Sequence, residues 1–103
     1  MNKEEKLLKI INHHGINTQQ RKLAEETFEL QEIITKYEDY YYENYDYGIG
    51  KVDWARWREH IAEEIADVCV LLLQFKEYYH IDGNDILRII NEKIDRTLER
   101  MEE

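Results

Sequence analysis

The chain contains no proline and only four glycines among its 103 residues. β-Sandwiches and barrels need many tight turns, and glycine and proline are two of the residues that form such turns most readily. So few turn-formers permit only a few connections between long elements. This feature constrains the fold more than any other, and it predicts an all-α protein.

Apolar residues recur at helical spacing in four stretches of the chain. The predicted helices span about residues 3–13, 17–42 and 53–79, and a fourth follows the turn at Asp82 and Gly83. Asn2 can cap the first helix, with Glu5 at the third position. The stripe expected to face inward on the fourth helix is Leu87, Ile90, Ile94, Leu98 and Met101. Because each stripe has to be buried, we expect one antiparallel four-helix bundle over residues 1–103, completed by oligomerisation.

Six of the eight tyrosines fall between Tyr37 and Tyr47, just before Gly48 and Gly50. We interpret this segment as a connection between helices, with helical ends. Tyrosines of this kind can stack on a base or form a lid, and they can also pack a subunit interface. The interface interpretation is favoured, because tyrosine is enriched there.

The formal net charge is −9, so the chain has no basic footprint for duplex nucleic acid or for an anionic membrane. Its longest apolar run, residues 68–73, is too short to span a bilayer. The single cysteine, Cys69, excludes an internal disulfide, and its place in that run predicts a buried thiol. With no apolar leader at the start of the chain, these features predict a cytoplasmic protein.

Two pairs of carboxylates lie beside the apolar stripes of the second and third predicted helices. Glu26 and Glu29 are three residues apart on the flank of the stripe that contains Leu23, and Glu64 and Asp67 are three apart immediately before the apolar run. At this spacing the two side chains of each pair converge. Like charges in a partly dry place are destabilising unless protons, basic side chains or a metal neutralise them.

A divalent cation is one of the three ways to neutralise these acids. Mg²⁺ prefers oxygen ligands and combines carboxylates with water and substrate phosphates. Di-iron bundles use Glu-x-x-His pairs, but in this chain the position of the histidine is occupied by Glu29 in one pair and by Asp67 in the other. An all-oxygen set therefore favours Mg²⁺ or Mn²⁺ over iron. The alternative is that the acids are simply solvated beside the core.

Three stretches together resemble the MazG-like nucleoside triphosphate pyrophosphohydrolases, an all-α superfamily. Residues 22–34, KLAEETFELQEII, match the family's E-E-x-x-E-L helix. Residues 63–73, EEIADVCVLLL, match its E-E-x-x-D helix, and residues 91–96, NEKIDR, match its N-x-K-x-x-R pattern. The motifs occur in the family's order, although 34 residues separate Glu29 from Glu64, more than is usual there.

The resemblance implies an activity and a site. The family cleaves nucleoside triphosphates between the α and β phosphates, often in cleaning the nucleotide pool, and its members are usually dimers or tetramers. It implies four metal ligands, which are Glu26, Glu29, Glu64 and Asp67. It also implies that Lys93 and Arg96 contact phosphate and that Asn91 contacts the nucleotide.

The remaining site candidates come from the residues themselves. A spare carboxylate, Glu25, Glu29 or Glu63, could accept the proton of the attacking water. Lys22 lies on the same flank as Glu26 and is a candidate for substrate binding. Trp57 is expected to pack in the core or to face a nucleobase.

Three functions stay open at this point. The first is a Mg²⁺-dependent pyrophosphohydrolase of NTPs or dNTPs. The second is a related enzyme for phosphoribosyl-ATP, dUTP or dCTP. The third is a non-catalytic helical oligomer that binds partners through its tyrosine-rich segment.

Overall fold

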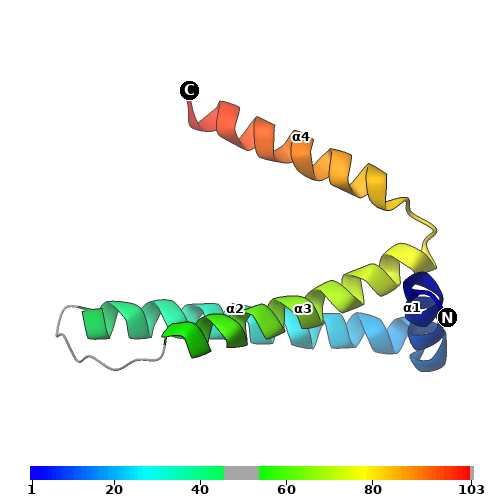
Figure 1. Cartoon of the computed structure of the whole chain (residues 1–103), viewed down its shortest axis with the longest axis horizontal. Helices are drawn as coiled ribbons and strands as arrows, with labels where there is room; N and C mark the ends of the chain where they lie inside the picture. Colours follow the sequence, from blue (N-terminus) through cyan, green and yellow to red (C-terminus); the bar gives the residue numbers. More distant parts are fainter. Residues whose placement is uncertain (46–53, 103) are drawn as a thin grey trace.

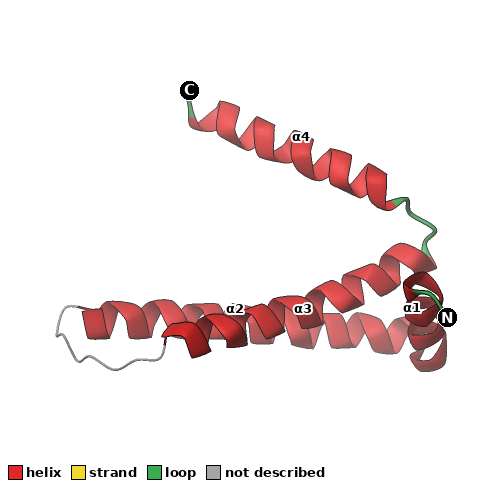
Figure 2. Cartoon of the chain, in the orientation of Figure 1, coloured by secondary structure: helices red, strands yellow, loops and turns green. Residues whose placement is uncertain are grey.

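The computed structural model describes the backbone of residues 1–45 and 54–102, and the side chains of residues 1–39 and 54–102. These ranges form four helices and no strand: α1 (Lys3–His14), α2 (Ile16–Tyr45), α3 (Trp54–Tyr78) and α4 (Gly83–Met101). The all-α prediction is confirmed. Helices α2 and α3 form a long antiparallel hairpin, and α1 lies across the end of it (Figures 1 and 2). None of the described helices is both long enough and apolar enough to cross a bilayer.

The ends of α1 follow the predicted caps. The side chain of Asn2 accepts a hydrogen bond of 2.8 Å from the backbone N–H of Glu5. Gly15 ends the helix with a φ of 89°, a left-handed conformation that glycine adopts at little cost. Helix α2 continues to Tyr45, past its predicted end near residue 42. The end of the tyrosine-rich segment and the residues that follow it, 46–53, lie outside the described residues, and so do Gly48 and Gly50.

Helices α2 and α3 meet along a seam in which facing residues recur three and four apart, as in a coiled coil. On α2 this seam contains Leu23, Leu30 and Ile33, which are half-buried. On α3 it contains Ile61 and then Val68 and Leu71, which are buried. The seam therefore carries the packing that holds the hairpin together.

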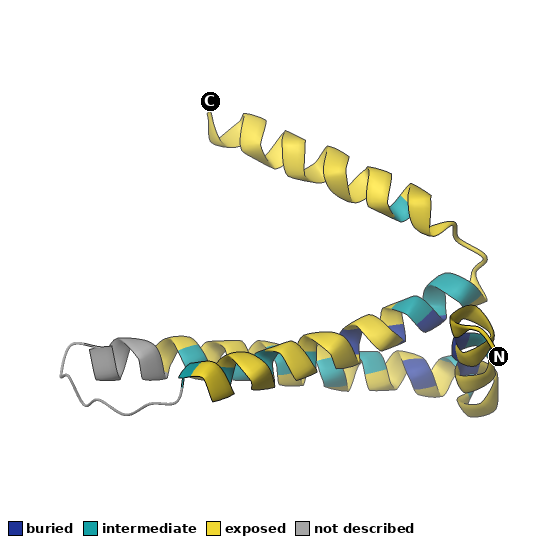
Figure 3. Ribbon diagram, viewed as in Figure 1, coloured by how far each residue is buried: buried dark blue, intermediate teal, exposed yellow. Residues whose placement is uncertain are grey.

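The buried core lies where α1, α2 and α3 meet (Figure 3). Its apolar members are Leu7 and Ile11 on α1 and Val68 and Leu71 on α3. Two buried amides, Gln19 and Gln74, pair across the hairpin at the same end. This end is the best-packed part of the described chain.

The apolar run of α3 is less buried than predicted. Val68 and Leu71 face the core, but Val70 and Leu72 are nearly half exposed. Cys69 is also exposed, so the prediction of a buried thiol is wrong. A helix turns about 100° per residue, and α1 and α2 cover only part of its circumference. The run is apolar on all sides of the helix, but the other helices of the chain cover only some of those sides.

Helix α4 extends away from the other three helices (Figure 1). None of its residues is fully buried, and the stripe predicted to face inward is exposed. That prediction is wrong for the single chain: α1, α2 and α3 pack with one another, and α4 does not complete a bundle with them. The pattern of α4 established that one face must be covered, but it could not say by what.

The junction before α4 is held by defined hydrogen bonds. His80 has a φ of 55°, and it forms the left-handed residue of a Schellman motif that ends α3. In this motif the N–H of His80 donates to the carbonyl of Glu77, and the N–H of Ile81 donates to that of Lys76. Asp82 then caps α4 by accepting from the N–H of Asn84 at 2.8 Å. The direction of α4 is therefore set by capping bonds on both sides of a short link.

Candidate metal centre

Two glutamates occupy positions in the α2–α3 seam that apolar residues would otherwise fill. Glu26 lies between Leu23 and Leu30 on α2, and Glu64 lies between Ile61 and Val68 on α3. Their side chains are only 16% and 17% exposed. The helices face each other here because the flanking residues are apolar. That packing is what brings two carboxylates into a partly dry space.

Asp67, one turn after Glu64 on α3, joins these two acids. One carboxylate oxygen from each of Glu26, Glu64 and Asp67 lies within 4.8 Å of the others. Asp67 is exposed, so the cluster opens to solvent on its side. The Oε2 atoms of Glu26 and Glu64 are buried, and neither accepts a hydrogen bond from the residues that the structure describes. Buried oxygens of this kind normally have a partner, so both carboxylates have acceptor capacity that a cation could use.

Few positive charges balance the cluster within the described chain. The Nζ atom of Lys22 lies 3.9 Å from Glu26. Nε2 of His60 lies 3.5 Å from Glu64, and this side chain carries a positive charge only when its imidazole is protonated. Burial raises the pKa of the Glu26 carboxyl above its ordinary value. The charges of Glu29, Asp67 and Glu64 raise this pKa further, and Lys22 opposes them. Burial and the repulsion from neighbouring acids raise the pKa of Glu26 more than Lys22 lowers it.

A cavity of about 170 Å³ opens beside the cluster on the same side of the hairpin as Glu29. Its lining comes from both helices and consists of Glu29, Glu32, Ile33, Lys36, His60 and Glu64. Glu64 thus belongs to both the acid cluster and the cavity wall. A ligand in the cavity would contact the cluster directly.

The structure brings together only some of the predicted site residues. Three of the four predicted ligands converge, and the fourth, Glu29, lies in the adjoining cavity wall. Glu25 and Glu63 are exposed and belong neither to the cluster nor to the cavity. Of the three candidate bases, only Glu29 therefore lies at the site.

The predicted phosphate-binding residues on α4 lie elsewhere in the single chain. Asn91, Lys93 and Arg96 are exposed on a helix that does not pack against α2 or α3. Lys93 lines an apolar groove formed by α4 residues alone. Within one chain, these three residues and the acid cluster do not form one site.

Trp57 lies in the seam one helical turn before His60. Its ring packs against Tyr37 of α2, with centroids 6.0 Å apart, and Trp54 contacts the same tyrosine edge-to-face at 5.3 Å. These aromatic contacts extend the seam beyond the cavity. The structure thus places Trp57 in helix packing, near the cavity and outside its lining.

His60 and Lys36 line the cavity, and the sequence argument did not place either at the site. A signal for them existed in the spacing. His60 is four residues before Glu64, and Lys36 is seven after Glu29, so each shares a helix face with a predicted ligand. Which of many such neighbours matter depends on how the two helices are rotated against each other.

The cluster's donors suit a hard divalent cation. Two oxygens bound to one Mg²⁺ lie about 3–4 Å apart, because each Mg–O bond is about 2.1 Å long. The three carboxylate oxygens of the cluster lie within 4.8 Å of one another, so their present spacing is at most somewhat wider than that. Three acids also leave coordination positions for water and phosphate oxygens.

No protein-family model, curated protein or solved structure matches this chain.

Proposed function

We propose that the chain is a Mg²⁺-dependent nucleoside triphosphate pyrophosphohydrolase of the cytoplasm, which converts an NTP or dNTP to the monophosphate and pyrophosphate. The observation that carries this proposal is the convergence of Glu26, Glu64 and Asp67, with two buried carboxylate oxygens that have no hydrogen-bond partner in the described part of the chain. The resemblance of these acids to the MazG-like motifs supplies the reaction. Mn²⁺ is the other metal that this donor set favours.

Glu26, Glu64 and Asp67 would hold the metal in this proposal. When bound, Mg²⁺ would offset the charge of the phosphate oxygens and make the α phosphorus more electrophilic. The cation would also reverse a local field that otherwise repels a polyanion, in a chain with a net charge of −9. In this proposal the three acids therefore bind the metal, and the metal binds the substrate phosphates.

Glu29 is the proposed general base. It lies in the cavity wall with Glu64, where it can accept a proton from water that attacks the α phosphorus. The new bond forms between the water oxygen and phosphorus, and the bond from phosphorus to the bridging oxygen breaks. The bridging oxygen leaves with pyrophosphate. Lys22 beside Glu26, and Lys36 in the cavity wall, where it pairs with Glu32 at 2.7 Å, would offset charge on the substrate.

The roles of Asn91, Lys93 and Arg96 rest on the resemblance alone. Their participation requires an α4 helix beside the α2–α3 hairpin, which the single chain does not provide. Substituting Lys93 therefore distinguishes a site made by α2 and α3 from one that also uses α4.

The test is direct. The purified protein is incubated with Mg²⁺ and a panel of NTPs, dNTPs, modified nucleotides and phosphoribosyl-ATP, and pyrophosphate and monophosphate are measured. Glu64→Gln and Asp67→Asn should lower kcat/KM by at least about 100-fold, because each removes a metal ligand. Glu59→Gln, an exposed acid on the same helix, is the matched control. A folded, Mg²⁺-binding protein that releases no pyrophosphate from any of these substrates would overturn the proposal.

The panel also separates the alternatives. Preference for phosphoribosyl-ATP, dUTP or dCTP would identify a specialised enzyme with the same metal site. A protein without activity, whose stability does not respond to Mg²⁺, would favour a non-catalytic helical oligomer.

A further inference from the structure

One line of side chains follows helix α2 from one side of the acid cluster to the other. Its members are separated by four and three residues in turn, so they share one face of the helix: Lys22, Glu26, Glu29, Ile33 and Lys36. A helix rises about 1.5 Å per residue, so Lys22 lies about 6 Å before Glu26 along the axis and Lys36 about 15 Å after it. The line is long enough to bind the two ends of one nucleotide at different places.

The two ends of this line differ. Helix α3 runs antiparallel to α2, so Asp67 lies towards the Lys22 end and His60 towards the Lys36 end (Figure 1). Asp67 is exposed to solvent, whereas at the other end both helices line the cavity of about 170 Å³. A site for a whole small-molecule ligand usually measures roughly 300–1,000 Å³. The cavity therefore fits one part of a nucleotide.

The charges of the cavity wall do not suit a chain of phosphates. The wall includes three carboxylates, those of Glu29, Glu32 and Glu64. Nζ of Lys36 lies 2.7 Å from Oε1 of Glu32, so this acid offsets much of the charge of the lysine. His60, the other basic side chain of the wall, lies beside Glu64. Phosphates in the cavity would therefore meet a surplus of negative charge.

A sugar suits the same wall. It carries no charge, and its hydroxyl groups donate hydrogen bonds that carboxylates accept. Glu32 offers carboxylate oxygens, and Ile33 offers an apolar surface against which a ring can pack. In a nucleotide the sugar is joined to the α phosphate. An α phosphate at the acid cluster therefore places the sugar next to it, where the cavity opens.

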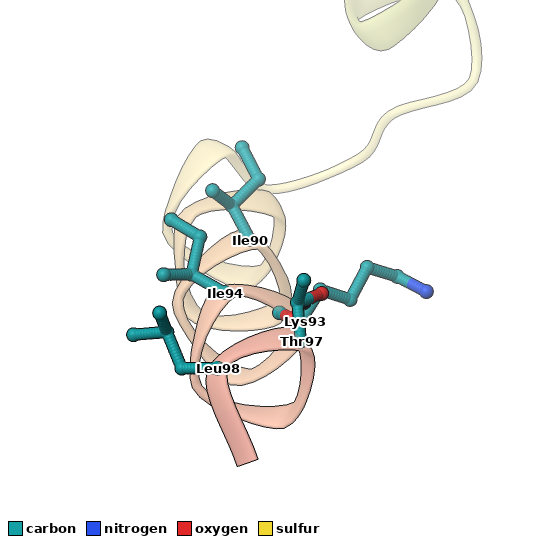
Figure 4. A pocket seen from close by; sticks show the side chains of 5 residues that line it. All are labelled: Ile90, Lys93, Ile94, Thr97 and Leu98. Carbon is teal, nitrogen blue, oxygen red and sulfur yellow. Dashed lines mark hydrogen bonds between the residues drawn. The ribbon is translucent and has the colours of Figure 1, made fainter. Parts of the chain in front are cut away.

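The position of the proposed base gives a second argument for the direction of the nucleotide. In phosphoryl transfer the attacking and leaving oxygens lie roughly in line, on opposite sides of phosphorus. Glu29 lies in the cavity wall, so pyrophosphate leaves towards the opposite end, where Nζ of Lys22 lies 3.9 Å from Glu26. Lys93 lies beside Ile94 in a groove of α4 residues, away from this line (Figure 4). Within one chain, Lys22 is thus placed to meet the leaving group.

We propose that a nucleotide lies along the hairpin in one direction, with its sugar in the cavity and its β and γ phosphates at the Lys22 end of the acid cluster. Glu32 is then a specificity residue for the sugar, and Lys22 binds the leaving pyrophosphate. This inference rests on the proposed function, because it requires the metal at the acid cluster and the attacking water at Glu29.

The two products of the reaction test the two ends separately. Isothermal titration calorimetry with Mg²⁺ measures how each variant binds a nucleoside monophosphate and pyrophosphate. Glu32→Ala should weaken monophosphate binding at least about fivefold, because a charged acceptor is lost, and should change pyrophosphate binding less than about twofold. Lys22→Met should weaken pyrophosphate binding at least about fivefold, with a smaller effect on the monophosphate. Glu38→Ala and Arg21→Met are the matched controls, because both residues are exposed on α2 and lie off the line.

Steady-state kinetics gives an independent measurement. Glu32→Ala should raise KM with little change in kcat, because the sugar makes the same contacts in the substrate and in the transition state. Lys22→Met should lower kcat, because charge builds up on the leaving group in the transition state. Circular dichroism checks that each variant keeps its helices.

Two outcomes would overturn this inference while the proposed function stands. In the first, Glu32→Ala changes pyrophosphate binding and Lys22→Met weakens monophosphate binding, which would place the phosphates in the cavity. In the second, both variants affect both products equally. A folded protein that cleaves no nucleotide overturns the proposed function, and this inference with it.

Discussion

Nε2 of Gln19 donates a hydrogen bond of 2.8 Å to Oε1 of Gln74, and both amides are 2% exposed. The pair joins the start of α2 to the end of α3, and α1 packs against both of these helices. A polar pair among buried apolar residues is satisfied only when the two helices keep one register. The amides thus align the hairpin that brings Glu26 opposite Glu64.

Replacing one amide of this pair should cost more than replacing both. Gln19→Leu leaves Oε1 of Gln74 buried without a donor, so it should lower the free energy of unfolding by about 1–3 kcal/mol. The double variant with Gln74→Leu should recover most of that loss, since two apolar side chains of similar size need no hydrogen bond. Urea unfolding at one fixed protein concentration measures both. Additive losses would show that the pair is not coupled.

Glu26→Gln should stabilise the metal-free protein at neutral pH. The folded state holds the pKa of this carboxyl above its ordinary value, so folding binds protons, and stability is lost as pH rises through the raised pKa. Glutamine removes that loss. The gain should be present at pH 7 and should disappear well below the ordinary glutamate pKa of 4.5, where the carboxyl is protonated in both states. Glu25→Gln, at an exposed position on the same helix, should show no such gain.

Mg²⁺ should raise the thermal midpoint of the wild-type protein. A cation that binds only the folded state adds about 1.4 kcal/mol at ten times its dissociation constant. For a chain of this size, each kcal/mol is worth roughly 4–8 °C. Differential scanning calorimetry with Mg²⁺, with Mn²⁺ and with a chelator measures the rise. Asp67→Asn should abolish it, whereas Glu59→Gln should leave it unchanged; an equal rise in both variants would place the cation elsewhere.

His80→Gly should stabilise the end of α3. The φ of 55° at His80 costs a residue with a Cβ about 1 kcal/mol that glycine does not lose. His80→Val should have the opposite effect, because a β-branched side chain tolerates this conformation least. Chemical denaturation of the three proteins gives the order. If valine were as stable as glycine, the left-handed conformation would not be present in solution.

The elements of the fold could be predicted from local pattern. Three local signals located the helices to within a few residues: the absence of proline, the four apolar stripes, and caps such as Asn2 and Asp82. Each of these signals can be recognised from residues that are close together in the sequence. The same locality explains the errors. Cys69 and Leu72 lie in an apolar run, but their burial depends on what packs on that side of α3, and no local signal reports it.

The candidate site divides in the same way. Spacing placed Glu64 and Asp67 on neighbouring turns of one helix, because a helix repeats every 3.6 residues. The rotation of α2 against α3 decides that Glu26 meets these two acids and that Glu29 lies in the wall of the adjoining cavity. The direction of α4 decides that Lys93 lies away from them. By itself the sequence determined which side chains share a helix face. Only the tertiary structure decided which faces meet, since that is set by contacts between residues far apart in the chain.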